Sequence, residues 1–111
     1  MSKNKKIFIC CTEQSGDNIV FNICKKIKKY NYQIDGVCGQ SSEIFFTKKF
    51  YDISSFKSLG LLEILLYIPK FLQIINNLKN EILLNKYDLV ICVDSPDFNY
   101  QLAKKLKKNN F

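Results

Sequence analysis

The sequence predicts an α/β fold, specifically a Rossmann-like parallel sheet with helices on both faces. Apolar runs with strand character alternate along the chain with segments whose apolar residues recur at helical spacing, the order that parallel β-α-β units require. Two of the runs, 6–11 and 88–93, are short and almost continuously apolar, as expected of parallel strands buried on both faces. The length of 111 residues suits one such domain and is too short for two.

In the first half of the chain, a polar loop separates the first apolar run from an amphipathic helix. Val20, Ile23, Cys24 and Ile27 lie on one face of this helix, and lysines occupy the other face and the last turn. We expect these elements in order: a strand at 6–11, a helix at 17–29, a strand at 32–38, a short helix at 41–49 and a brief strand at 50–53.

In the second half, a long helical stripe covers 61–84, and Pro69 predicts a kink or a break within it. Its first half carries more apolar residues than one contact with a sheet requires. Burial against a partner domain would explain this excess, and a surface facing a membrane or an acyl chain is the alternative. The clearest strand, 88–93, follows, and a helix is expected at 97–108.

The net charge of +7 comes entirely from lysine, because the chain contains no arginine. Heavy use of Lys, Asn and Ile is typical of an A/T-biased genome, so we predict no nucleic-acid partner. The absence of histidine excludes His-based catalysis and most zinc sites. Five cysteines without a Cys-x-x-Cys pair predict buried, reduced thiols. With no secretory signal or spanning segment in evidence, we expect a cytoplasmic protein.

The fold class itself indicates where a ligand would bind. In the common doubly wound order the first and fourth strands are neighbours, and ligands bind beyond their carboxyl ends. Loops 12–17 and 94–97 follow these two strands, so we expect them to face each other.

The first of these loops has a helix N-terminus behind it and Gly16 within it, which would suit a phosphate or another anionic group. The alternative is that Ser15 or Asp17 simply caps the helix. In the second loop, Asp94 ends a buried strand and would act either as a general base or as a cap. Asp97 is better explained as an acid in the first turn of the last helix.

Three segments together resemble lipid-A-disaccharide synthase, an inverting glycosyltransferase of the two-domain B type. Loop 12–17, Thr-Glu-Gln-Ser-Gly-Asp, is similar to the family's Gly-Glu-x-Ser-Gly-Asp, with Thr12 in place of the first glycine. Segment 58–65 resembles its Met-Gly-hydrophobic-hydrophobic-Glu-hydrophobic-Leu stretch, and segment 94–99 matches Asp-x-Pro-Asp-Phe-Asn. The order and spacing of the three segments also agree.

The resemblance implies transfer of diacylglucosamine from its UDP derivative to diacylglucosamine 1-phosphate, without a metal or another cofactor. Asp94 matches the family's proposed general base, and Glu13 matches another acid of the acceptor crevice. The remaining substrate-binding residues that we expect from the motifs are Ser15, Gly16, Asp17, Gly60, Glu63, Asp97 and Asn99.

The resemblance further implies that residues 1–111 form a truncated N-terminal, acceptor-side domain without the C-terminal domain that holds the UDP-sugar. We therefore expect the chain to be inactive alone and to need a separate C-terminal half. Acylated substrates and a basic surface suit a peripheral position at the inner membrane. Two alternatives remain open at this point: a non-enzymatic binding or receiver-like module, and a decayed remnant of the enzyme.

Overall fold

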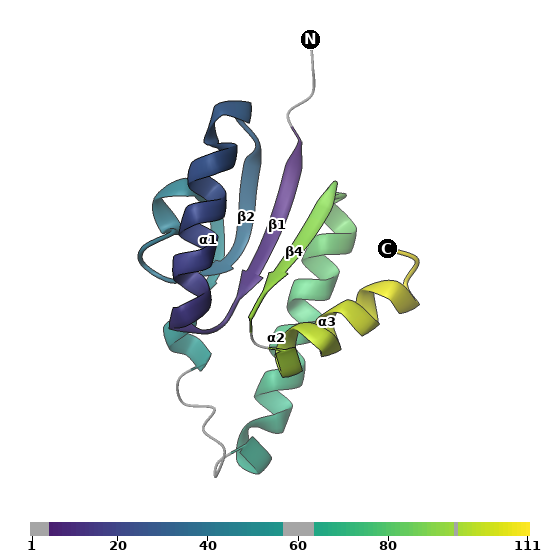
Figure 1. Cartoon of the computed structure of the whole chain (residues 1–111). Helices are drawn as coiled ribbons and strands as arrows, with labels where there is room; N and C mark the ends of the chain where they lie inside the picture. The colour runs from purple at the N-terminus through teal and green to yellow at the C-terminus, as the bar shows by residue number, and fades with distance from the viewer. Residues whose placement is uncertain (1–4, 57–63, 95) are drawn as a thin grey trace.

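The computed structural model describes residues 5–56, 64–94 and 96–111. Its centre is a four-stranded parallel sheet with the strand order β3-β2-β1-β4 (Figure 1). The strands are β1 (Lys6–Cys11), β2 (Gln33–Cys38), β3 (Lys48–Asp52) and β4 (Leu89–Val93). The helices are α1 (Gln14–Ile27), α2 (Ile64–Asn85) and α3 (Pro96–Lys108), with single 3-10 turns at Lys28–Tyr30, Glu43–Phe45 and Ile53–Phe56.

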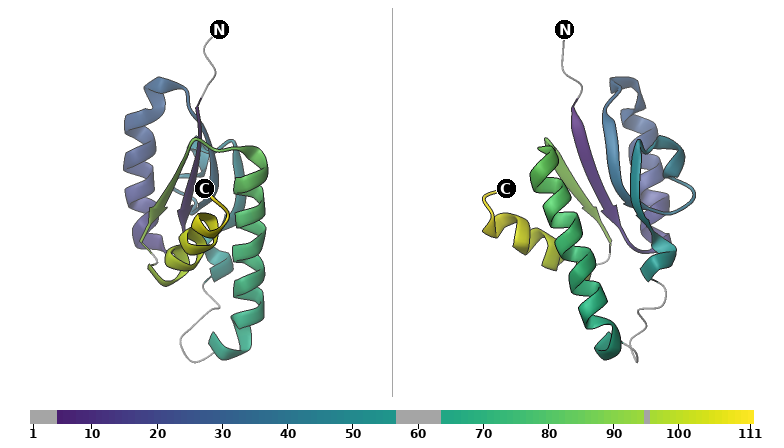
Figure 2. Two further views of the ribbon diagram at one scale, coloured as in Figure 1. Left: turned by 90° about the vertical axis from the view of Figure 1, so that its right-hand side faces the viewer. Right: turned by 180° about the vertical axis from the view of Figure 1, so that it is seen from behind.

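The helices cover both faces of the sheet, as the sequence predicts. Figure 2 shows α1 on one face and α2 on the other, with α3 beside α2. Alternation along the strands divides the core accordingly, because successive side chains of a strand point to opposite faces. Ile7, Ile9 and Cys11 pack with Val20 and Cys24 of α1. The opposite cluster is larger and joins β1 and β2 to α2 and α3 through Phe8, Cys10, Val37, Ile75, Leu78, Phe98 and Leu102.

The first and fourth strands are neighbours, which confirms the expected winding. Ile7 pairs with Leu89 and Cys11 with Val93, so β1 and β4 end at the same edge of the sheet. The carboxyl ends of all four parallel strands lie along this edge, and we call it the carboxyl edge. The loops that follow β1 and β4 are therefore brought together.

The segment 41–49 differs from the prediction of a short helix. The only helical residues there are the single 3-10 turn Glu43–Phe45, and β3 begins at Lys48 rather than at Phe50. The backbone N–H of Lys48 donates a 3.1 Å hydrogen bond to Oδ1 of Asp35, a buried residue of β2. This bond to the neighbouring strand, together with the pairing of β3 with β2, holds Lys48 and Lys49 in the sheet, although lysine has little strand character of its own.

Helix boundaries also differ from the prediction at two places. α1 begins at Gln14, three residues earlier than expected, so the polar loop after β1 is very short. α2 runs through Pro69 without a break. Pro69 is the sixth residue of α2, so it removes the N–H that would bond the carbonyl of Leu65, and the helix continues on both sides of this missing bond.

Four of the five cysteines are buried and all five are free thiols, but Cys92 is exposed. Cys92 lies on β4, an edge strand whose Leu89 is also 49% exposed. The expectation of buried, reduced thiols is therefore correct for four cysteines and wrong for the burial of Cys92. No helix in the described ranges is long and apolar enough to cross a membrane.

A polar network closes the opposite edge of the sheet, where the strands begin. The hydroxyl of Tyr87 donates a 2.5 Å hydrogen bond to the buried carboxylate of Asp35, and Gln33 donates another at 3.0 Å. Lys6 extends along this edge, since its Nζ donates to the carbonyl of Asn85 and lies 4.9 Å from the centre of the Tyr87 ring. These contacts hold the turn between α2 and β4 against the start of β1.

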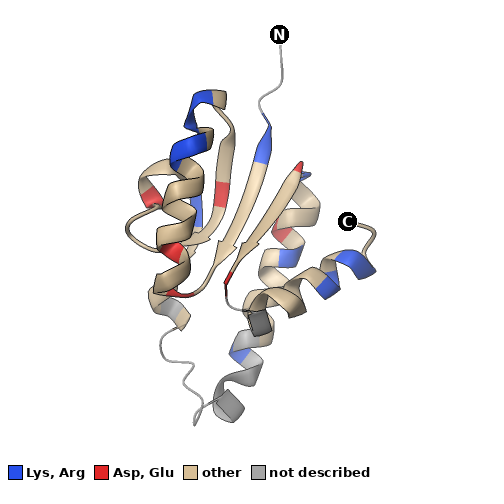
Figure 3. Cartoon of the chain, in the orientation of Figure 1, with Lys and Arg blue, Asp and Glu red and all other residues tan. Residues whose placement is uncertain are grey.

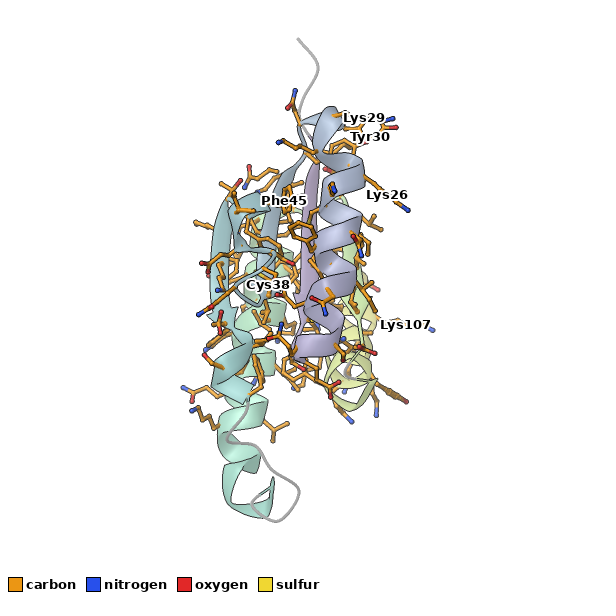
Figure 4. The ribbon with its side chains drawn as sticks, turned by 60° about the vertical axis from the view of Figure 1, so that its left-hand side comes forward. Lys26, Lys29, Tyr30, Cys38, Phe45 and Lys107 are labelled. Atoms are coloured by element: carbon orange, nitrogen blue, oxygen red, sulfur yellow. The ribbon has the colours of Figure 1, made fainter. Side chains whose placement is uncertain are left out.

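Charge is distributed unevenly between the two edges. In Figure 3 lysines gather where α1 ends and along the last part of α3, whereas acidic residues lie where β1 and β4 end. Figure 4 shows Lys29 and Tyr30 together at the far end of α1, with Lys26 close to them and Lys107 well separated from all three. The net positive charge of the chain is therefore not concentrated at the carboxyl edge.

Candidate active site

The two loops singled out by the sequence are in direct contact. The hydroxyl of Ser15, in the first turn of α1, donates a 3.0 Å hydrogen bond to Oδ2 of Asp94, the residue that follows β4. Both side chains are exposed. The expectation that loops 12–17 and 94–97 face each other is thus confirmed, with Ser15 and Asp94 as the point of contact.

The backbone at Asp94 adopts an unusual conformation. Its φ is +55°, in the left-handed region that a non-glycine residue seldom occupies, although aspartate tolerates it better than most. Asn99, in the first turn of α3, donates its amide to the carbonyl oxygens of Asp94 at 2.6 Å and of Val93 at 3.3 Å. Asn99 is only 6% exposed. Its side chain therefore fixes the turn that presents the Asp94 carboxylate to solvent.

Gly16 makes the close approach of the two loops possible. A Cβ atom at this position would lie 2.6 Å from Sγ of Cys11 and 3.2 Å from Cβ of Asp94. Any larger residue would push α1 away from the ends of β1 and β4. The glycine thus serves packing between protein elements at the site.

Asp17 is fully buried, and its carboxylate is occupied by backbone donors. Oδ1 accepts from the N–H of Gly39 at 2.9 Å, and Oδ2 accepts from the N–H of Ser41 at 3.1 Å. A side chain at Gly39 would clash with Asp17, because its Cβ would lie 2.6 Å from Oδ2 of that carboxylate. Asp17 consequently ties α1 to the loop after β2 and does not cap its own helix.

Glu13 occupies the N-cap position of α1 with an extended backbone, and its side chain makes no capping hydrogen bond. The side chain is exposed, while its carbonyl accepts from the N–H of Asp17 at 3.1 Å and from Sγ of Cys11. Its carboxylate is therefore available at the same edge as Asp94, at the positive end of the helix dipole.

Three of the expected site residues cannot be placed as fully. Gly60 and Glu63 lie outside the described residues, and Asp97 belongs to the first turn of α3, but its side chain is outside the described part of the chain. Among the described residues, no group of three or more Cys, Asp or Glu side chains is arranged to hold a metal ion. Burial raises the pKa of Cys11 to about 11, which keeps this nearby thiol protonated and poorly nucleophilic at neutral pH.

A polar recess at the carboxyl edge was not anticipated from the sequence. It has a volume of about 250 Å³ and is lined by Gln14, Gln40, Ser41, Asp52, Ile53 and Ser54. These residues lie at the start of α1, in the loop after β2, at the end of β3 and in the 3-10 turn that follows it, and only Gln14 belongs to a motif. The spacing of the others along the chain carries no signal that would gather them.

Comparison with known proteins shows which family the chain resembles. Residues 7–111 match the family model described as lipid-A-disaccharide synthetase. The chain is 35% identical to the lipid-A-disaccharide synthase of Blochmanniella pennsylvanica over 97% of its own length and 29% of that protein. It is 32% identical to the Rickettsia typhi enzyme, with 94% and 28% covered, and 35% identical to that of Wigglesworthia glossinidia brevipalpis, with 96% and 29% covered.

The chain thus spans less than a third of the length of the curated relatives that it matches. The matched part is their N-terminal region, and these relatives are glycosyltransferases of the B type. A match over nearly the whole chain also decides against the alternative of a receiver-like module. The chain belongs to the lipid-A-disaccharide synthetase family.

Proposed function

We propose that residues 1–111 form the acceptor-side domain of a lipid-A-disaccharide synthase and that Asp94 is its general base. The observation that supports this most strongly is the placement of the Asp94 carboxylate. It is exposed beyond the end of β4, oriented by the hydroxyl of Ser15, and carried on a turn that Asn99 fixes. A base must be held within hydrogen-bond reach of its substrate, and the bonds from Asn99 to the carbonyls of Val93 and Asp94 help to hold the backbone that carries this carboxylate.

In the proposed reaction, Asp94 accepts the proton of the acceptor hydroxyl on diacylglucosamine 1-phosphate. The hydroxyl oxygen forms a bond to the anomeric carbon of UDP-diacylglucosamine on the face opposite the leaving group, while the bond from that carbon to the UDP oxygen breaks. The configuration inverts, and UDP leaves with the electron pair. Glu13, exposed and free of a capping bond, is proposed to contact the acceptor at the same edge.

The other described motif residues contact protein groups, and these contacts hold the loops of the site in place. Gly16 leaves room for Asp94, Asp17 holds the loop after β2, and the amide of Asn99 is bound to backbone carbonyls. We therefore assign ligand contact to Glu13, Ser15 and Asp94. The parts of Gly60, Glu63 and Asp97 in binding the substrate stay predictions.

We further propose that the UDP-sugar is held by a part of the enzyme that corresponds to the remainder of the relatives, outside residues 1–111. The coverage of 28–29% of the relatives' length supports this proposal. A domain that binds only the acceptor should not turn over by itself, so activity is expected only in the presence of that part.

The test is complementation with purified components. The chain is combined with the C-terminal remainder of a relative such as the Wigglesworthia enzyme, and disaccharide and UDP are measured from the two acylated substrates. Asp94→Asn should lower the rate by about 10²- to 10⁴-fold, the usual contribution of a general base. Asp88→Asn, an exposed acid at the other end of β4, is the matched control and should keep the rate. A wild-type pair that makes no disaccharide, or an Asp94→Asn pair at full rate, would contradict the proposal.

We also propose that the protein works at the cytoplasmic face of the inner membrane as a peripheral protein. Exposed Tyr100, Lys104 and Lys107 share one face of α3, an arrangement that suits anionic lipid headgroups. Sedimentation with vesicles containing anionic lipid should retain the chain, whereas vesicles of neutral lipid should not. Replacing Lys104 and Lys107 by glutamine should release it, and equal retention on both kinds of vesicle would contradict the proposal.

A further inference from the structure

The polar recess at the carboxyl edge has no role in the function proposed so far. Its residues lie at or just beyond the carboxyl ends of β1, β2 and β3, on the same edge of the sheet as Asp94, which follows β4. Gln14 connects the two regions directly, because the next residue, Ser15, holds the carboxylate of Asp94. A ligand bound at Asp94 would therefore have the recess beside it.

Several exposed polar side chains line the recess. In the described part of the chain, the carboxamides of Gln14 and Gln40 and the hydroxyl of Ser41 make no hydrogen bond with another residue, and all three residues are exposed. Each carboxamide has two N–H donors and a carbonyl acceptor, and a hydroxyl has one O–H donor and an oxygen that accepts. Groups of this kind match the alternating donor and acceptor character of sugar hydroxyls.

The charge of the recess favours a neutral ligand group. Its acid, Asp52, forms an ion pair with Lys49, which also binds Glu43, and the second oxygen of Asp52 accepts the N–H of Ser54 at 2.9 Å. The nearby cation is therefore already neutralised by two carboxylates. A phosphate would find no unpaired cation among the residues that line the recess.

The recess is also held in shape by the buried contacts of Asp17. The N–H groups of Gly39 and Ser41 donate to its carboxylate, and the hydroxyl of Ser42 donates to its carbonyl at 2.9 Å. These three bonds fix the loop that carries Gln40 and Ser41. A preorganised loop binds a ligand at a lower cost in conformational entropy than a mobile one.

We propose that the polar recess binds hydroxyl groups of the acceptor's glucosamine ring while Asp94 takes the proton from the attacking hydroxyl. This inference rests on the proposed function, because that function identifies the acceptor as a sugar. The volume of about 250 Å³ is below the range of about 300–1,000 Å³ typical of complete ligand pockets, so the recess suits one part of a larger ligand. The phosphate and acyl chains would lie outside it.

The kinetic test uses the complemented pair. Gln40→Ala and Ser41→Ala should each raise the KM for diacylglucosamine 1-phosphate by about 3- to 10-fold with kcat nearly unchanged, as expected when a neutral hydrogen bond to the bound ligand is lost. Gln101→Ala removes an exposed carboxamide on α3 and is the matched control. An unchanged KM in both recess variants, in a pair that Asp94→Asn inactivates, would overturn this inference and leave the proposed function intact.

A binding test on the 111-residue chain does not depend on turnover. Glucosamine 1-phosphate and glucosamine should both shift the backbone amide signals of Gln40, Ser41 and Ser54 in NMR spectra, and Gln40→Ala should weaken both effects. Inorganic phosphate should leave these signals in place. Shifts produced by phosphate but not by glucosamine, or shifts by neither sugar, would overturn the assignment. If the sugars shift these signals while the complemented pair is inactive, only the proposed function fails.

Discussion

The hydroxyl of Ser15 lies 3.0 Å from Oδ2 of Asp94, although 79 residues separate the two along the chain. The contact exists because β1 and β4 are adjacent parallel strands that end at the same edge. It joins the start of α1 to the turn before α3, so the position of the proposed base depends on both halves of the chain.

Ser15→Ala should lower kcat of the complemented pair by about 10-fold, because the Asp94 carboxylate loses the donor that orients it. The change lies on the surface, so the free energy of unfolding should stay within about 0.5 kcal/mol of wild type. Ser15→Thr keeps a hydroxyl and should recover most of the rate. If alanine and threonine give equal rates, the hydrogen bond has no part in orienting Asp94.

Gly16→Ala should destabilise the fold by about 1–3 kcal/mol, as overpacking of a core usually does. The added methyl group would lie 2.6 Å from Sγ of Cys11. In a Cys11→Ala background the same change should cost less, since the obstructing sulfur is gone. Urea unfolding of the four proteins in this double-mutant cycle measures the coupling, and strictly additive costs would contradict the steric explanation.

Asp17→Asn should destabilise the fold by about 1–3 kcal/mol, because an amide can accept only one of the two backbone bonds and its NH₂ group would oppose the other donor. The neighbouring exposed Asn18 offers a control, and Asn18→Ala should change stability by less than about 0.5 kcal/mol. Denaturant unfolding followed by circular dichroism gives both values. Similar midpoints for the two variants would be inconsistent with the buried role of Asp17.

Tyr87→Phe should destabilise the fold by about 1–3 kcal/mol, because the buried carboxylate of Asp35 loses a donor. Burial and the bond to Asp35 raise the pKa of Tyr87 well above its ordinary value. A raised pKa in the folded state stabilises the protein below about pH 10, and this contribution is lost as the pH rises further. The free energy of unfolding, measured below and above pH 10, should fall more steeply with rising pH in wild type than in Tyr87→Phe. Equal slopes in the two proteins would contradict this role of Tyr87.

The parts of the fold that the sequence predicts well are those fixed by local pattern. The strands predicted at 6–11 and 88–93 are almost continuously apolar, and α3 shows a regular helical stripe, so their positions agree within one residue. The local pattern around Lys48 predicts the end of a helix, whereas the structure has the start of β3 there. Its strand is created by pairing with β2 and by the bond from its N–H to Asp35, neither of which leaves a trace in the local sequence.

The candidate site likewise has features that the sequence predicts and features that it does not. Fold logic places loop 12–17 opposite the loop that begins at Asp94, and the structure confirms this proximity through the contact between Ser15 and Asp94. The burial of Asp17 was not foreseen, because its partners Gly39 and Ser41 follow a different strand and resemble ordinary loop residues. The same applies to the polar recess, which exists only where three loops converge.

At Asp94, whose backbone is left-handed, the residue that suits stability best differs from the residue that the proposed function needs. Glycine would occupy this conformation with less strain, so a protein shaped only by the need to remain folded would gain from losing the side chain. Aspartate at this position lowers the stability of the fold slightly but places a carboxylate at the carboxyl edge. In a chain that has lost its activity, nothing would oppose replacement of this aspartate by glycine. The residue at position 94 in related chains therefore indicates whether they still depend on the carboxylate.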